Sequence, residues 1–214
     1  MKVCEGNDIR NVALVGHGHA GKTSLTAGLL FTAGATNRLT RADEGSTITD
    51  FDEEEIQRKL TISTGVAYVE RNKKKINILD TPGYNIFIND TKCAMVAADA
   101  ALVVVDGVAG VEVQTEKVWS FANEFKLPRA FAINKLDLER SSFERALESI
   151  QNVFGRAAVP VYLPIGAEKE FTGIVDLVEM KAFQYKPDGD GKGQEIPIPA
   201  SMAEAAKEAH ERLV

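Results

Sequence analysis

Residues 16–23 carry a glycine-rich pattern whose chemistry is phosphate binding. They read GHGHAGKT and match G-x-x-x-x-G-K-[ST] between a strand-like run and a helix-like run. The glycines let the backbone curl so that its N–H groups face phosphate oxygens, while Lys22 adds a positive charge and Thr23 a Mg²⁺ ligand. We therefore expect phosphate binding in this loop. The expected contacts come from Gly16, His17, Gly18, His19, Ala20, Gly21, Lys22, Thr23 and Ser24.

Two histidines of this loop, His17 and His19, could suggest a metal site. They lie inside the phosphate pattern, and no third ligand follows at a suitable spacing. We therefore interpret them as residues of the phosphate loop rather than as zinc ligands.

A second motif, Asp80-Thr81-Pro82-Gly83, follows the apolar run 76–79. A carboxylate at the end of this strand would lie where the phosphate loop opens. Asp80 is expected to hold Mg²⁺ through water, and the N–H of Gly83 to sense a γ-phosphate. The tetrapeptide alone is an ordinary turn, so its value depends on the strand before it and on the phosphate loop upstream.

A third motif, Asn134-Lys135-Leu136-Asp137, follows the apolar run 130–133. The Asp137 carboxylate can accept hydrogen bonds from N1–H and the 2-amino group of guanine, whereas adenine would leave it unpaired. Asn134 would tie this loop to the base and to the phosphate loop, and the stem of Lys135 can lie over the purine ring. The three motifs in this order favour a guanine nucleotide, with a P-loop kinase or ATPase as the alternative.

The elements that must position these motifs alternate along the chain. Buried strands are expected at 12–15, 76–79, 101–105 and 130–133. Helical spacing follows around Val118–Phe125 and from Phe143 to Phe154, where Ser141 with Glu144 forms a capping box and Gly155 a left-handed end. This alternation predicts an α/β fold of the P-loop NTPase type, with a mainly parallel sheet and helices on both faces.

The segment 32–60 shows no periodicity and is acidic in its second half, and we interpret it as a functional loop. After Pro160 the pattern changes: 171–185 is expected to be extended and 187–193 turn-rich. Ser201 with Glu204 would open a helix that reaches Val214 without a stop signal. We expect a nucleotide-binding domain at 1–158 and the truncated start of a small α+β subdomain at 159–214.

Two local patterns are weak evidence for further functions. The run that begins at Asp188 opens like a calcium loop, but Lys192 and Pro199 stand where oxygen ligands belong. Lys73, Lys74 and Lys75 lie between two strand-like runs and fit a solvated hairpin turn better than an RNA-binding patch.

Composition excludes several classes of protein. The net charge of −6 argues against non-specific nucleic-acid binding, and no run is long and apolar enough for a membrane span. Cys4 and Cys93 are far apart and predict reduced thiols. With no targeting pattern at the N-terminus, we expect a cytoplasmic chain that acts as a monomer.

Beyond its three motifs, the chain resembles the translational GTPases, and elongation factor G and its paralogues in particular. Residues 58–62, RKLTI, are similar to the family's R-G-I-T-I segment, whose Thr closes on Mg²⁺ and the γ-phosphate, which implies that role for Thr61. Residues 163–168 and 171–176 are similar to the start of the insertion found in elongation factor G. The resemblance implies GTP hydrolysis with GTP/GDP and Mg²⁺ as cofactors, further domains after Val214, and the ribosome as partner.

The chain departs from the family's pattern at four positions. The family usually has His after D-T-P-G, where this chain has Tyr84, and an apolar residue and an Asp where it has Gly18 and His19. Lys59 replaces a usual Gly. A phenol does not become a cationic donor at neutral pH, and loss of one proton-handling group commonly costs roughly 10²–10⁴-fold in rate. We expect a divergent elongation factor G-like paralogue.

Two hypotheses for function follow. In the first the chain hydrolyses GTP, with Mg²⁺ bound by Thr23, Thr61 and Asp80. Catalysis would then rest on Lys22, Thr61, Gly83 and Tyr84. In the second it is a slow GTP-dependent switch that orders segment 32–61 and binds the ribosome in translocation or recycling with little turnover.

Overall fold

The computed structural model describes residues 4–186 and 189–214, so Pro187 and Asp188, which open the predicted turn-rich connection and the calcium-like run, lie outside it. The chain forms two compact units. Unit 1 comprises Met1–Asp106 and Val111–Asn134, and unit 2 comprises Gly107–Gly110 and Lys135–Val214. The predicted domain boundary at 158/159 stays a prediction.

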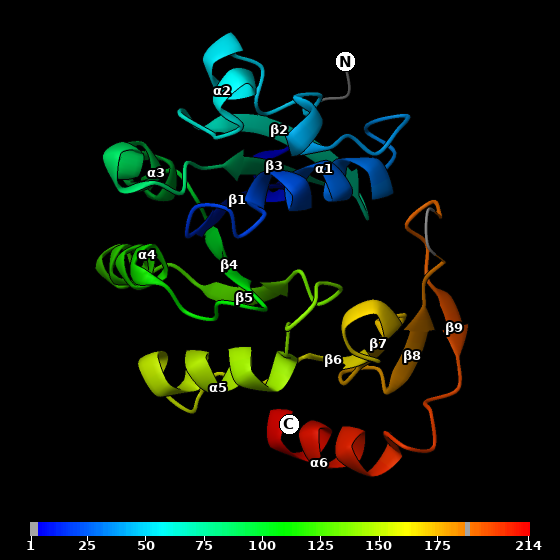
Figure 1. Cartoon of the computed structure of the whole chain (residues 1–214). Helices are drawn as coiled ribbons and strands as arrows, with labels where there is room; N and C mark the ends of the chain where they lie inside the picture. Colours follow the sequence, from blue (N-terminus) through cyan, green and yellow to red (C-terminus); the bar gives the residue numbers. More distant parts are fainter. Residues whose placement is uncertain (1–3, 187–188) are drawn as a thin grey trace. The chain divides into compact units, whose positions relative to one another are not determined.

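Unit 1 is built on a five-stranded sheet of order β2-β3-β1-β4-β5, in which only the β2-β3 pair is antiparallel (Figure 1). Its strands are β1 (Ile9–Gly16), β2 (Gly65–Arg71), β3 (Lys74–Asp80), β4 (Ala100–Asp106) and β5 (Arg129–Asn134). All four predicted apolar strands are therefore present. The β2-β3 hairpin turns at Asn72 and Lys73, which both have positive φ, so the predicted hairpin turn is present. Of the three lysines predicted to form it, Lys74 and Lys75 lie in β3 instead.

Helices cover both faces of this sheet, which confirms the predicted α/β class. They are α1 (Lys22–Thr32), α3 (Ile88–Val96) and α4 (Val113–Glu124). Helix α1 packs on β1, β2 and β3, where Leu14, Leu30 and Ile78 share an apolar core. Helix α4 packs on β1 and β4. Short 3₁₀ turns lie at Gly6–Asp8 and Asn85–Phe87.

The segment 32–60 is not a structureless loop. It contains a 3₁₀ turn at Ala42–Glu44 and the helix α2 (Glu53–Arg58). Asp52 accepts from the N–H of Glu54, and Glu55 bonds back to the N–H of Asp52, so the acidic run is a capping box. The helix is too short to show apolar periodicity, which is why the sequence pattern did not reveal it.

Unit 2 holds a four-stranded antiparallel sheet of order β6-β7-β8-β9 (Figure 1). Its elements are α5 (Phe143–Phe154), β6 (Tyr162–Ile165), a 3₁₀ turn (Glu168–Glu170), β7 (Gly173–Asp176), β8 (Lys181–Gln184), β9 (Gln194–Ile196) and α6 (Ala203–Leu213). Val175, Leu177, Ala182 and Ala206 form its core, so α6 covers this sheet. The expected small α+β subdomain is thus present as a sheet and a helix.

Two predicted helix starts are wrong by one or two residues. Helix α5 is capped by Ser142, whose hydroxyl accepts from the N–H of Arg145, because the Ser141 hydroxyl donates instead to the carbonyl of Leu136. Helix α6 begins at Ala203 after Met202, with no side-chain cap, so Ser201 does not form a capping box.

The two predicted helix ends match the structure only in part. Gly155 ends α5 with a positive φ of 98°, but its ψ of 159° is not that of a left-handed helix. Helix α6 ends at Leu213, one residue before the end of the chain. No described helix is long and apolar enough to cross a membrane.

Candidate functional site

The phosphate loop joins the end of β1 to the start of α1 and depends on two glycines. Gly16 has φ of 144°, and a Cβ there would lie 2.4 Å from the carbonyl oxygen of Val104. Gly21 caps α1 in the left-handed conformation, with φ of 94°. His19 also has a positive φ of 63°, although it is not glycine. The residues predicted to contact phosphate thus lie at the end of β1, in the tight turn between β1 and α1, and in the first turn of α1.

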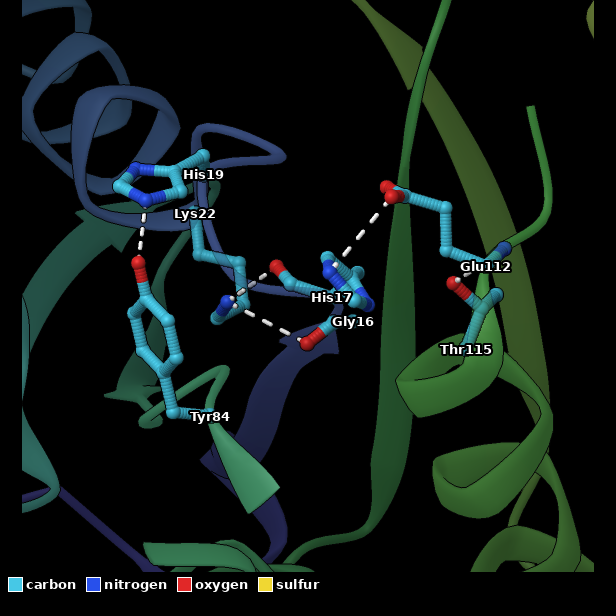
Figure 2. A network of polar contacts seen from close by, with 7 residues as sticks. All are labelled: Gly16, His17, His19, Lys22, Tyr84, Glu112 and Thr115. Atoms are coloured by element: carbon cyan, nitrogen blue, oxygen red, sulfur yellow. Dashed lines mark hydrogen bonds and ion pairs between the residues drawn. The ribbon is translucent and has the colours of Figure 1, made fainter. Parts of the chain in front are cut away.

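Lys22 lies in the interior of this loop and is only 6% exposed. Its Nζ donates hydrogen bonds to the carbonyl oxygens of His17, at 2.9 Å, and Gly16, at 3.3 Å (Figure 2). Burial lowers the pKa of Lys22 to about 8, while the nearby carboxylates of Asp80 and Asp50 act in the opposite direction.

Asp80 ends β3 opposite Leu14 of β1 and is fully buried. Its Oδ2 accepts from the hydroxyl of Thr49 at 2.8 Å, whereas its Oδ1 has no hydrogen-bond partner within the described residues. Burial raises the pKa of Asp80 to about 6, and the hydrogen bond from Thr49 and the charge of Lys22 only partly offset it. A buried carboxylate oxygen without a partner is costly and calls for a ligand.

Thr61 lies beside Thr23, and its role toward Mg²⁺ and the γ-phosphate stays a prediction. The hydroxyl of Thr61 donates to Oδ1 of Asp50 at 2.9 Å, and the two threonine hydroxyls are 3.1 Å apart. The hydroxyl of Thr61 therefore links Asp50 to Thr23. Burial also raises the pKa of Asp50.

The residues predicted to bind Mg²⁺ fit a hard cation by their chemistry. Thr23, Thr61 and Asp80 supply hydroxyl and carboxylate oxygens, the ligands that Mg²⁺ prefers, and Asp80 Oδ1 is the orphaned oxygen among them. Residues 4–186 and 189–214 contain no cluster of three His, Cys, Asp or Glu side chains that could bind a metal without such hydroxyls. The metal role stays a prediction.

Glu55 is a buried carboxylate that the sequence interpretation missed. Its Oε1 accepts from the backbone N–H groups of Ile62 and Ser63, at 2.9 and 3.1 Å, directly after Thr61. Farther on, Asp90 of α3 accepts from the N–H and the hydroxyl of Thr64. These acids hold the backbone that carries Thr61. The D-x-x-E spacing of the capping box was the available signal for Glu55.

The D-T-P-G segment packs directly on the phosphate loop. A Cβ added to Gly83 would lie 2.4 Å from Nζ of Lys22 and 2.7 Å from the N atom of Gly18. Thr81 donates to the carbonyl of Leu14, and the carbonyl of Pro82 accepts from the hydroxyl of Thr91. Only glycine fits at position 83, so the backbone there can approach whatever the loop binds.

The two histidines of the loop have separate partners (Figure 2). Nε2 of His19 is hydrogen-bonded to the hydroxyl of Tyr84. Nε2 of His17 lies 3.5 Å from a carboxylate oxygen of Glu112, the residue that precedes α4. No sequence pattern predicted the contribution of Glu112, because it depends on the packing of β1 and α4.

The guanine motif is divided between the units. Asn134 ends β5, and its side-chain amide donates to the carbonyl of Ala20 at 3.0 Å, which is the expected tie to the phosphate loop. Lys135 and Asp137 follow in unit 2, where Lys135 has a positive φ of 60° and Asp137 is exposed. Base recognition by these two residues stays a prediction.

In unit 1, β1, β3 and β5 therefore end at one edge of the sheet with a phosphate loop, a buried acid and an amide that binds that loop. Ligands of open α/β sheets bind at this edge. The arrangement defines a P-loop nucleotide-binding domain.

The chain belongs to the family described as the elongation factor Tu GTP binding domain, whose model matches residues 7–210. It is 38% identical to elongation factor G of Granulibacter bethesdensis over 96% of its length and 35% identical to that of Mycoplasma pneumoniae over 97%. The expected place among the translational GTPases is confirmed.

A crystal structure of a protein from Thermus thermophilus has the same fold. The TM-score is 0.90 at 36% identity, over 97% of this chain and 31% of that one. This chain spans about 30% of the length of each of these two elongation factors G.

Proposed function

We propose that this chain is the GTP-binding and GTP-hydrolysing domain of an elongation factor G-like translation factor that acts on the ribosome, in translocation or recycling. The observation that carries the proposal is that Thr61 and the D-T-P-G segment, which begins at Asp80, both pack on the phosphate loop of unit 1. Family membership supports the guanine nucleotide. The protein would work in the cytoplasm as a monomer.

Each side chain of this cluster has a proposed role. Lys22 exchanges its two carbonyl contacts for phosphate oxygens, and the N–H of Gly83 binds the γ-phosphate. Thr23, Thr61 and Asp80 would hold Mg²⁺, which would neutralise the charge of the nucleotide phosphates. Because the hydroxyl of Thr61 already contacts that of Thr23, the backbone around Thr61 would need to move little for both residues to hold the same ion.

Guanine specificity is assigned to the third motif. Asn134 fixes the base loop to the phosphate loop, the stem of Lys135 covers the purine and the carboxylate of Asp137 accepts from N1–H and the 2-amino group. We also propose the domain boundary at 158/159, with 159–214 as the start of the inserted subdomain.

A slow switch is the second candidate, and it is favoured by Tyr84, which stands where elongation factor G usually has a histidine. A phenol does not become a cationic donor at neutral pH, so it is a weaker proton-handling group than that histidine. As a slow switch, the chain would bind GTP, which would order segment 32–61 and promote ribosome binding with little turnover.

Turnover of GTP by the full-length protein, with and without ribosomes, separates the two candidates. Fast ribosome-stimulated hydrolysis by the wild type, reduced in Tyr84→Phe, supports the enzyme. A slow wild type that Tyr84→His accelerates supports the switch. Tighter binding of ATP than of GTP would refute both.

The Asp137→Asn variant tests whether Asp137 recognises the guanine base. Asp137→Asn should lose affinity for GDP and gain affinity for xanthosine diphosphate, because the amide presents a donor to the 2-oxo group. An unchanged preference for guanine would remove Asp137 from the base site.

A further inference from the structure

Three positions at which this chain departs from the elongation factor G pattern meet in one contact of unit 1. The hydroxyl of Tyr84 is hydrogen-bonded to Nε2 of His19, and the two rings meet edge to face, with centroids 5.4 Å apart and planes at 87° (Figure 2). A Cβ added to Gly18 would lie 3.2 Å from two atoms of the Tyr84 ring. A larger side chain at position 18 would therefore have to displace the ring.

We propose that His19 is a positioning residue for Tyr84 in GTP hydrolysis. A residue of the phosphate loop would then orient the catalytic residue that follows the D-T-P-G segment. The inference rests on the proposed GTPase function. Gly18 leaves room for the ring, His19 fixes the hydroxyl, and Tyr84 touches the attacking water.

The hydrogen-bonding capacity of a phenol explains what His19 adds. A tyrosine hydroxyl has one hydrogen to donate and lone pairs that accept. With Nδ1–H on the imidazole, Nε2 of His19 accepts the phenolic hydrogen, and the Tyr84 oxygen can only accept from the water. A water that donates to Tyr84 turns a lone pair of its own toward the phosphorus. Without His19 the hydroxyl would rotate between donating and accepting.

The chemical step leaves both side chains unchanged. The water oxygen forms a bond to the γ-phosphorus while the bond from that phosphorus to the bridging oxygen breaks, and the electron pair leaves with GDP. The water's proton passes to a phosphate oxygen. Tyr84 and His19 lower the barrier by orientation, which is worth about 10²-fold when a reacting group would otherwise be misplaced.

Stability alone does not account for this pair. His19 is exposed and holds a left-handed backbone conformation, which costs a non-glycine residue free energy. Its side chain makes its contact with Tyr84 at the surface of the loop rather than in the apolar core. Such strain at an exposed loop residue is typical of a functional site.

A double-mutant cycle on the full-length protein tests the inference. The measured quantities are kcat and KM for GTP in the presence of ribosomes, and the affinity for a fluorescent GDP analogue. The variants are Tyr84→Phe, His19→Ala and their combination, with His19→Gln to restore a hydrogen-bonding side-chain group at that position. Tyr68→Phe, which removes a hydroxyl from the exposed face of β2, is the matched control.

If the inference is right, each single variant lowers kcat by about 10²-fold, the double variant falls no further, and His19→Gln recovers part of the loss. KM, GDP affinity and the Tyr68→Phe variant stay within about threefold of the wild type. Losses in kcat that multiply in the double variant, or a His19→Ala defect confined to GDP affinity, would overturn it. A wild type that hydrolyses no GTP under any condition would overturn the proposed function as well.

Discussion

Replacing Asp80 by Asn should stabilise the domain when nucleotide and divalent cations are absent. A carboxyl whose folded-state pKa is raised binds its proton more tightly when folded, so folding loses free energy as the pH rises through the interval between the two values. For Asp80 that interval runs from the ordinary pKa of 3.8 to about 6. The cost is complete above about pH 6.

The size of the effect follows from this interval. About two pKa units correspond to about 3 kcal/mol of lost stability at neutral pH. The amide of Asn carries no charge, and its oxygen can still accept from Thr49. Because the new amide hydrogens also need partners, we expect the free energy of unfolding at pH 7 to rise by about 2 kcal/mol.

Urea denaturation in EDTA from pH 4 to pH 8 measures this quantity. Trp119 is the single tryptophan of the chain and stacks on Phe131 with ring centroids 5.1 Å apart, so its fluorescence reports the unfolding of unit 1. Asp8→Asn, which changes an exposed carboxylate paired with Lys74, is the matched control and should shift stability by less than about 1 kcal/mol.

Two results would refute the reasoning. One is an Asp80→Asn variant no more stable than the wild type at pH 7, and the other is a variant that keeps the wild-type loss of stability between pH 4 and 6. Added GDP and Mg²⁺ should reverse the order, since a ligand at 100 times its Kd stabilises the wild type by about 2.7 kcal/mol.

Three further predictions use the same unfolding assay, with nucleotide binding as a second readout. Gly16→Ala should abolish nucleotide binding, because the new Cβ would collide with the carbonyl of Val104; normal GDP affinity would show that the loop can move aside. Glu55→Ala should cost roughly 2–4 kcal/mol and speed amide hydrogen exchange just after Thr61, since backbone donors lose their acceptor. Lys59→Gly should stabilise the domain by about 1 kcal/mol, because Lys59 ends α2 in a left-handed conformation; a loss of stability would contradict this.

The sequence predicted the four parallel strands of unit 1 and the phosphate loop because local chemistry and fold agree there. Each motif follows an apolar run, and the carboxyl ends of parallel strands lie at one edge of a sheet. The structure also explains why the family usually has Gly where this chain has Lys59. The backbone at this position is left-handed, a conformation that glycine adopts without strain.

The rest of the site depends on contacts between residues far apart in the chain. Thr49 reaches Asp80 and Asp50 reaches Thr61, and neither pair has a sequence spacing that would reveal it. The start of helix α5 is a second example of a feature that sequence spacing alone does not determine. Ser141 and Ser142 are equivalent as caps in the sequence, and the choice falls to Ser142 because Leu136 takes the hydroxyl of Ser141.

The distribution of buried charge argues that unit 1 is organised around a ligand. Among the described residues, the charged side chains that are buried are Lys22, Asp50, Glu55 and Asp80, and all of them belong to the phosphate loop or the segments that bond to it. Glu55 is satisfied by backbone donors, whereas Asp80 keeps an oxygen without a partner. A protein selected for stability alone would place an apolar or neutral side chain at position 80. The cost is confined to the edge where the phosphate loop opens, and a cation bound with nucleotide phosphates is the ligand that would offset it.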